Sequence, residues 1–350
     1  MIWFTLATLA PVILLTLAGL LGGGWSLAAL IYMTAFTYLM DRLAKGAAAR
    51  SGADGEFPSG HTLSVLLGLA HPVLLALAVA ALGHGTRGLT ENIALFLGFG
   101  LFFGQVSNSN AHELIHRSAK WPRRLGKLVY ITLLFGHHAS AHVRVHHVHV
   151  ATDKDPNSAR RGEGFYHFWP RAWIGSFTAG LRAETALRSR ASTSKSTLGH
   201  PYVAYVGGAA LTVFAAYAIA GTGGIAALLA LAIYAQMQLM LSDYVQHYGL
   251  RRETGEDGKP EPVGPGHSWN TPHFWSSALM LNAPRHSDHH IRPSRSYPSL
   301  ELDPATMPVL PRSLPVMGAM AMLPPLWKRT MNRRLDRLGG SLPNPPETLD

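Results

Sequence analysis

The chain has 350 residues, of which 47% are hydrophobic and only 14% are charged, well below the roughly 25% charged residues of soluble domains. It contains no cysteine, which excludes disulfides and any iron–sulfur cluster or rubredoxin-type iron held by cysteines of this chain. The formal net charge of +10 suits anionic lipid, an acidic partner or nucleic acid, and the positions of the charges distinguish among these.

Six apolar runs are each close to the roughly 20 residues that a membrane-spanning helix needs. They cover residues 2–22, 26–40, 61–83, 92–112, 201–220 and 224–242. The first run lacks the basic start of a signal peptide, and the second follows after only "GGGW". The sequence therefore predicts an all-α integral membrane protein with six transmembrane helices.

Basic residues indicate how these helices are oriented. If the N-terminus is cytoplasmic, the outer connections hold one basic residue, Arg87, and the other 29 lysines and arginines fall on the inner side. Examples are Arg42, Lys45 and Arg50 after the second run. The positive-inside rule then predicts two cytoplasmic termini. This asymmetry accounts for most of the net charge, so no nucleic-acid partner is expected.

Three further segments are not expected to span the membrane. Residues 122–141 are mildly apolar but short, which favours an interfacial or re-entrant helix. Residues 254–266 are rich in proline and glycine and predict a cytoplasmic loop. Residues 305–327 are apolar but hold five prolines, so we expect them to pack on the membrane face.

Nine of the 19 histidines form four clusters at the predicted inner ends of the helices or just beyond them. The clusters are "HELIH", "HVRVHH", "DYVQH" and "RHSDHH", with His112, His116, His142, His146, His147, His247, His286, His289 and His290. A lone histidine is usually an ordinary polar side chain. Nine of them on one side of the membrane exceed the three or four ligands of a single metal, so they predict a dinuclear centre. Imidazole ligands with open positions suit iron that activates dioxygen.

Other interpretations of these histidines are less complete. HExxH is the zinc-protease signature, but a protease needs only three ligands, and helical spacing turns Glu113 away from the His112/His116 face. A metal transporter would carry its ligands deep within the spans. Among the other histidines, His84 and His200 fall in loops. His71 precedes Pro72 within a span, where a kink or a functional role is expected.

The motifs "HELIHR", "HVRVHHVHVATDKDPNSAR", "DYVQHYGLRR", "HSWN" and "RHSDHH" resemble those of the bacterial membrane alkane 1-monooxygenases, within the membrane fatty-acid desaturase and hydroxylase group. The resemblance runs from about Asp41 to residues 323–329. It implies one domain over residues 1–350, with a six-span bundle in 1–248 and a cytoplasmic segment in 249–350 that completes the metal site.

The resemblance also implies a function. Members of this group bind two irons through the nine histidines and use O₂ to hydroxylate the terminal carbon of medium- or long-chain n-alkanes. Their electrons come from rubredoxin, which a rubredoxin reductase reduces, and they lie in the bacterial inner membrane with the metal site on the cytoplasmic side. A xylene-type methyl hydroxylase and a fatty-acyl desaturase or hydroxylase are alternatives with the same di-iron chemistry.

The chain departs from the group's motifs at three positions. Arg117 stands where lysine is usual, and Ala141 and Gln246 stand where glutamate is usual. The nine histidines are unaffected. Three carboxylates, Asp155, Asp243 and Asp288, remain near the motifs as candidates to orient the imidazoles from behind.

Overall fold

The computed structural model describes residues 1–44, 58–190 and 196–338. Two of the basic residues used to orient the chain, Lys45 and Arg50, lie outside these ranges. In the described part the chain is helical, and its strand-like pairings are two isolated bridges. The predicted all-α architecture is therefore confirmed.

Four helices are long and apolar enough to cross a membrane. They are α1 (Ile2–Leu21), Gly60–Gly83 within α4 (Pro58–Gly83), the continuous helix Leu89–Ile115, and α11 (Pro201–His247). The third is built from α5 (Leu89–Leu101), the π-helical turn η3 (Phe102–Ser107) and α6 (Asn108–Ile115). Together they make the chain a membrane protein, as its composition predicts.

The other predicted spans appear in a different form. The run 26–40 lies in α2 (Gly24–Ile31), η1 (Tyr32–Phe36) and α3 (Thr37–Leu43), whose tyrosines and threonines lower the hydropathy, and it is not among the four. The runs 201–220 and 224–242 both lie within α11. The count of six crossings therefore stays a prediction.

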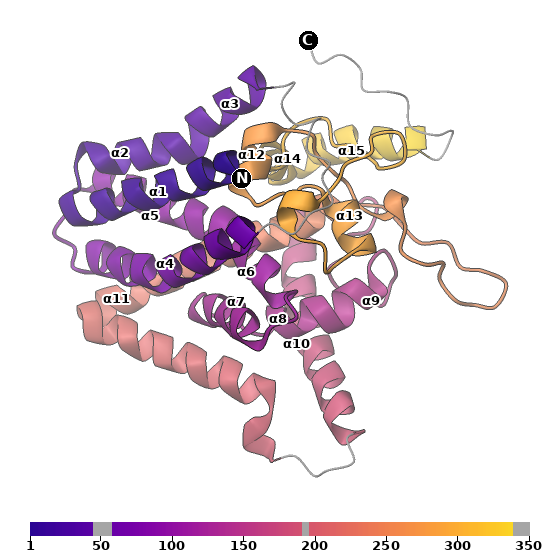
Figure 1. Cartoon of the computed structure of the whole chain (residues 1–350), viewed down its shortest axis with the longest axis horizontal. Coiled ribbons are helices and arrows are strands. Elements are labelled where there is room, and N and C mark those ends of the chain that lie inside the picture. Colours follow the sequence, from indigo (N-terminus) through magenta and orange to yellow (C-terminus); the bar gives the residue numbers. More distant parts are fainter. Residues whose placement is uncertain (45–57, 191–195, 339–350) are drawn as a thin grey trace.

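α11 reverses direction in its middle. At 47 residues a straight helix would be about 70 Å long, more than twice the roughly 30 Å hydrocarbon core. Its helical geometry breaks at Ala220 and Gly221, and Gly221 has φ 59°, which favours glycine. Gly224 lets the arms approach, because a Cβ there would lie 2.1 Å from the carbonyl oxygen of Ala216. Figure 1 shows the two arms meeting at the left of the molecule.

The segment 122–141 is not one helix. α7 (Lys120–Thr132) is amphipathic and buries Leu125 and Val129, and α8 (His138–Ala141) follows after a turn. Leu134 in this turn has a positive φ of 57°, which no helix continues through. The predicted interfacial or re-entrant helix thus ends at Thr132 and does not continue to residue 141, and α7 is not among the four apolar spans.

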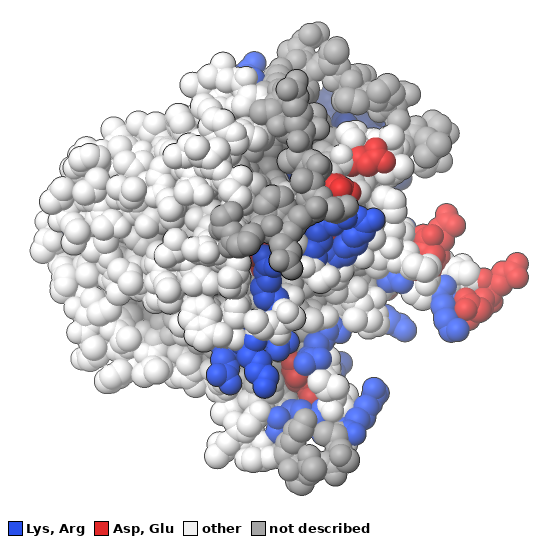
Figure 2. Space-filling model, in the orientation of Figure 1, with Lys and Arg blue, Asp and Glu red and all other residues white. Residues whose placement is uncertain are grey.

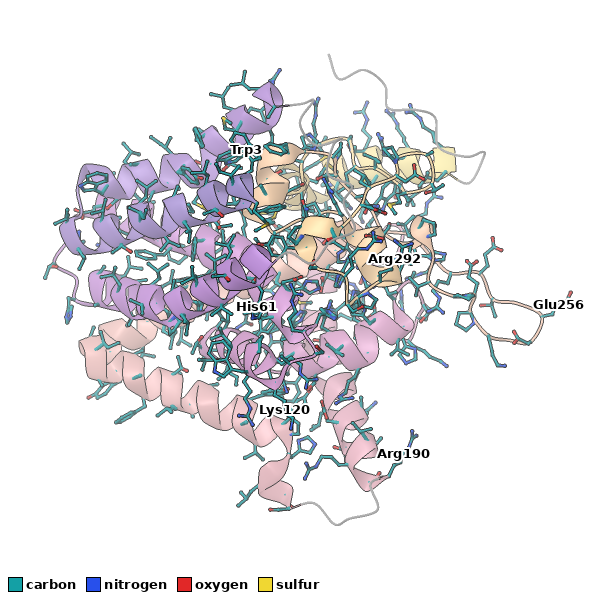
Figure 3. All side chains as sticks on the ribbon, viewed as in Figure 1. Trp3, His61, Lys120, Arg190, Glu256 and Arg292 are labelled. Carbon is teal, nitrogen blue, oxygen red and sulfur yellow. The ribbon has the colours of Figure 1, made fainter. Side chains whose placement is uncertain are left out.

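The remaining helical elements are shorter or more polar than the four apolar helices. They are η4 (His142–His146), α9 (His147–His149), α10 (Phe165–Ser189), η5 (Thr197–Gly199), η6 (Pro265–His267), α12 (Phe274–Leu279), α13 (His286–Ile291), η7 (Tyr297–Ser299), α14 (Leu314–Ala321) and α15 (Pro324–Leu338). The predicted loop 254–266 protrudes at the right of Figure 3, with Glu256 near its tip. Within the predicted segment 305–327, α14 packs against α11.

Charge divides the molecule into two zones. On the face shown in Figure 2, the half that contains α1, α2 and α4 is free of Lys, Arg, Asp and Glu, and these residues gather on the opposite half. Three short helices that carry histidine motifs, α6, α9 and α13, lie in the charged half near its border with the uncharged one. The candidate site thus lies where the apolar helices end.

Candidate metal centre

All nine predicted histidines meet, and they form two adjoining groups. In each group the candidate ligand atoms lie within 4.8 Å of one another. The five-histidine group contains His112, His116, His142, His147 and His289, and the four-histidine group contains His146, His247, His286 and His290. The groups touch where the ring centroids of His147 and His290 lie 4.6 Å apart. Two sites side by side are what the histidine count predicts.

Within each group the Nε2 atoms of several histidines point at one another. In the five-histidine group, Nε2 of His142 lies 2.8 Å from that of His112 and 2.9 Å from that of His147. In the four-histidine group, Nε2 of His286 lies 3.0 Å from that of His247 and 3.1 Å from that of His290. A ring nitrogen of neutral imidazole has either one N–H or one lone pair. Three-way contacts of this kind fit lone pairs that point at a shared cation.

A π-helical turn decides which histidine joins which group. In η4 the N–H of His147 donates to the carbonyl of His142, five residues back. His142 and His147 therefore share the five-histidine group, and His146 faces the other one. Ordinary helical spacing pairs residues four apart, as it does for His286 and His290 in α13. Such π-turns occur frequently at functional sites.

The surroundings keep most of these imidazoles neutral. Burial lowers the pKa of His116 to about 4. Burial, followed by the charges of neighbouring histidines, also lowers the pKa values of His142, His289 and His290 well below the ordinary value. A neutral imidazole offers the lone pair that a metal requires. The donor set therefore fits a pair of transition-metal ions.

His146 is held from behind by a carboxylate. Asp155, itself buried, accepts a hydrogen bond of 2.8 Å from Nδ1 of His146. Burial lowers the pKa of His146, but the charge and hydrogen bond of Asp155 outweigh this and leave the pKa raised. Nε2 of His146 has no hydrogen-bond partner in the described part of the chain and lies in the four-histidine group. A carboxylate behind a histidine in this way fixes its tautomer and raises its basicity as a ligand.

The other two predicted carboxylates have different contacts. Asp243 accepts a hydrogen bond of 2.6 Å from Nδ2 of Asn157. Asp288 accepts one of 3.0 Å from Nη1 of Arg295. Glu113 forms an ion pair with Arg117, as expected for a side chain that faces away from the His112/His116 pair.

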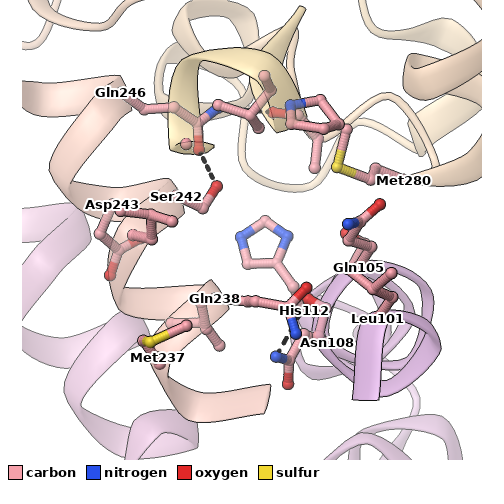
Figure 4. Close-up of a pocket in the computed structure, with 18 of the residues that line it drawn as sticks. Leu101, Gln105, Asn108, His112, Met237, Gln238, Ser242, Asp243, Gln246 and Met280 are labelled. Atoms are coloured by element: carbon pink, nitrogen blue, oxygen red, sulfur yellow. Dashed lines mark hydrogen bonds between the residues drawn. The ribbon is translucent and has the colours of Figure 1, made fainter. Parts of the chain in front are cut away.

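A cavity of about 270 Å³ leads to both histidine groups. One wall comes from α5, η3 and α6, the opposite wall from the second arm of α11, and α14 forms a side. Figure 4 shows His112 between these walls, with Gln105 and Asn108 on one side and Gln238 and Ser242 on the other. His112 and His142 of the five-histidine group and His286 of the four-histidine group line the inner end.

Two buried histidines were missed by the sequence analysis. His138 lines the cavity, with its ring centroid 5.2 Å from that of His142 and its ring stacked on Phe135. Its neighbour His137 packs against Trp173. The signal was present, because His138 lies four residues before His142. By contrast, the ring nitrogens of His71 lie 3.0 Å from the hydroxyls of Ser107 and Thr132, which gives it a role in helix packing.

Comparison with known proteins identifies the family of the chain. The model of the family described as fatty acid desaturase matches residues 89–319. The chain belongs to this family. It is 34% identical to an alkane 1-monooxygenase of Ectopseudomonas oleovorans over 273 residues, which are 76% of this chain and 67% of the relative.

Other relatives match in the same way. An alkane 1-monooxygenase of Alcanivorax borkumensis is 30% identical over 71% of this chain and 65% of its own length. The hydroxylase component of a xylene/toluene monooxygenase of Pseudomonas putida is 28% identical over 62% of this chain and 57% of its own length. The chain thus spans about two thirds or less of the length of these relatives. The family resemblance inferred from the motifs is confirmed.

Proposed function

We propose that this protein uses O₂ to hydroxylate the terminal carbon of medium- or long-chain n-alkanes to primary alcohols. The observation that carries the proposal is the cavity, which is lined by histidines of both groups at its inner end and by Leu101, Met237 and Leu241 further along. An apolar chain that fills it presents one end to the candidate metal centre. The similarity to alkane 1-monooxygenases supports the same substrate class.

We further propose that the five-histidine and four-histidine groups each hold one iron. When bound, the irons supply the oxidant that an unactivated C–H bond requires, because such a bond offers no handle for acid–base chemistry. The overall reaction is RH + O₂ + 2e⁻ + 2H⁺ → ROH + H₂O. Asp155 holds the imidazole of His146 in the tautomer that leaves Nε2 free.

The cavity walls position the substrate and limit the water that reaches the centre. Asn108 bridges the two walls by donating a hydrogen bond of 2.9 Å to the carbonyl of Ala235 on α11. Gln246 is likewise fixed, since its Nε2 donates to the carbonyl of Ala283 and its Oε1 accepts from Ser242. The amide groups of Asn108 and Gln246 therefore have hydrogen-bond partners within the protein and do not depend on water in the cavity for these bonds.

Electrons must come from outside the chain, because it has no cysteine for an iron–sulfur relay. We propose that rubredoxin, reduced by rubredoxin reductase, docks on lysine and arginine side chains in the charged half of the molecule seen in Figure 2. Arg123 and Arg124 are exposed on α7, which packs against the α6 helix of His112. An acidic carrier protein would be steered to such a surface.

The proposed setting is the bacterial inner membrane, with six crossings and with both termini and the metal centre on the cytoplasmic side. This orientation puts the docking surface in the same compartment as a cytoplasmic donor. Reporter fusions at Gly85 and Thr222 should then be periplasmic, and one after Gly258 should be cytoplasmic. The opposite pattern would remove the donor's access and refute this orientation.

One experiment tests the activity directly. The protein is purified, its metal is measured by elemental analysis, and alkane turnover is assayed with added rubredoxin and reductase. We expect iron and a primary alcohol whose formation depends on O₂ and on both electron carriers. Stoichiometric zinc without iron in active protein would refute the di-iron proposal. Products from xylene or fatty-acyl substrates but not from alkanes would instead support the alternative substrate classes.

A further inference from the structure

The cavity has a defined end away from the histidines. The lining residue farthest from His112 on its own helix is Leu101, eleven residues earlier, and the one farthest from His247 on α11 is Tyr234. At 1.5 Å per helical residue, the cavity therefore extends roughly 15–20 Å from the metal centre. An extended alkyl chain with one end at the centre would have its other end near these two side chains.

The ring of Tyr234 crosses from one wall to the other at this end. It projects from α11 and stacks on Phe96 of α5, with centroids 5.4 Å apart and planes 28° apart. It also lies over Gly100 of α5, where an added Cβ would be only 2.3 Å from Cδ1 of the ring. Because Gly100 has no side chain, the ring of Tyr234 fits against the α5 backbone and does not fill the open part of the cavity.

The next turn repeats this arrangement and fixes the spacing of the walls. A Cβ at Gly104 would lie 2.2 Å from Nε2 of Gln238. That amide donates a hydrogen bond of 2.9 Å to the carbonyl of Gly100. The two glycines therefore let α11 side chains lie flat against the backbone of α5 and η3. Contacts with Phe96 and Gly100 on the opposite wall set the position of the Tyr234 ring.

We propose that Tyr234, seated on Gly100, is the end wall of the substrate cavity and sets the longest chain that the protein accepts. The inference rests on the proposed function and adds the residue pair that determines chain length. Removing the ring lengthens the cavity. Adding a methyl group at position 100 displaces the Tyr234 ring into the empty cavity, because the ring is free to move only in that direction. The cavity then becomes shorter.

Three variants and a control test this. Tyr234→Ala should shift the products toward longer alkanes, and Gly100→Ala should shift them toward shorter ones. The double variant should behave like Tyr234→Ala, because no ring is left to displace. Tyr217→Ala, at a side chain that is 53% exposed on the first arm of α11 and is not among the cavity-lining residues, should keep the wild-type profile.

The measurement is a profile over a homologous series of n-alkanes. Products are quantified with donor proteins present, and retention of the same alkanes by purified protein is quantified by mass spectrometry after detergent exchange. Discrimination of one methylene in an apolar pocket is worth roughly 10–200-fold. We therefore expect the ratio of long-chain to short-chain product to rise at least about tenfold in Tyr234→Ala and to fall by a similar factor in Gly100→Ala.

The outcomes separate this inference from the proposed function. If the wild type forms no alcohol from any alkane, the proposed function fails, while the retention profiles still test the end wall. If the wild type is active and both profiles of the variants match it, Tyr234 is not the end wall. A uniform change at all chain lengths would make Tyr234 part of an access route and would also overturn the inference. Tyr234→Leu, which keeps an apolar side chain of intermediate size, should give an intermediate shift. It replaces Tyr234→Ala in the test if the alanine variant does not fold.

Discussion

Substituting Asp155 by asparagine isolates the carboxylate behind His146. In the structure Oδ2 of Asp155 accepts from Nδ1 of His146 at 2.8 Å and from Oγ of Ser158 at 2.7 Å, and Oδ1 accepts from the backbone N–H of Asn157 at 3.1 Å. Asparagine keeps the shape but replaces one acceptor oxygen by an NH₂ donor. In either amide orientation, at least one of these three donors then faces another donor.

Two effects set the expected magnitude. Hydrogen bonds to charged groups contribute about 1.5–3 kcal/mol. Loss of a carboxylate behind a metal-binding histidine lowers metal affinity by about 10–100-fold, which corresponds to about 1.4–2.7 kcal/mol. Both describe the same interaction, so they overlap and do not add. We therefore expect the four-histidine group to bind its metal about 10–100-fold more weakly, while the five-histidine group is unaffected.

The assay is competition with a chelator, followed by elemental analysis of the protein. In Asp155→Asn, half of the metal should be lost at a lower chelator concentration than in the wild type. Asp153→Asn is the matched control, because that side chain is 82% exposed in the same loop and lies 3.8 and 4.0 Å from Arg251 and Arg160. If both variants lose metal at the wild-type chelator concentration, the hydrogen bond to His146 does not support metal binding.

Three further predictions follow from other contacts. His290→Ala should empty the four-histidine group and leave metal in the other, measured by elemental analysis; loss of all metal would show that the two groups do not bind independently. Gly224→Ala should destabilise the protein by about 1–3 kcal/mol, because the added Cβ would meet the backbone of the other arm of α11. The control Gly207→Ala, whose Cβ would lie in open space, should not lower the melting temperature. Reversing Arg123 and Arg124 to glutamate should raise the half-saturating rubredoxin concentration at low salt and less at high salt; an unchanged value at low salt, with metal content intact, would exclude this docking surface.

The members of the metal centre could be predicted from the sequence, but not their division into two groups. Turn-spaced histidines must face one side of a helix. Two of the clusters lie at the ends of apolar runs, and the other two follow in segments expected on the same side of the membrane, so all four were expected to come together. The division depends on the π-turn at His142–His146, and neither propensity nor periodicity indicates a π-turn. His138 belongs to none of the four motifs, and its helical spacing of four residues before His142 is the sequence signal that was overlooked.

The fold shows the same limit. Hydropathy identifies apolar runs but does not register a change in chain direction, so the reversal of α11 at Gly221 separates two predicted spans within one helical element. The break after Thr132 has a tertiary cause. Leu134 adopts a positive φ, and the next residue, Phe135, is buried against His138, so packing of the following residues outweighs the helical preference of leucine.

The two lost glutamates are accommodated by the surroundings of their replacements. Nε2 of Gln246 donates to the carbonyl of Ala283, and an ionised glutamate would place an acceptor against that carbonyl. Ala141 is packed against α10, where a Cβ at Gly180 would lie 3.2 Å from it, so a longer side chain has little space on that side. Neither position readily takes a carboxylate back, and Asp155 is the carboxylate that hydrogen-bonds to His146. For this reason Asp155→Asn should weaken metal binding more than Gln246→Glu strengthens it, and a Gln246→Glu variant with tighter metal binding and unchanged stability would contradict this account.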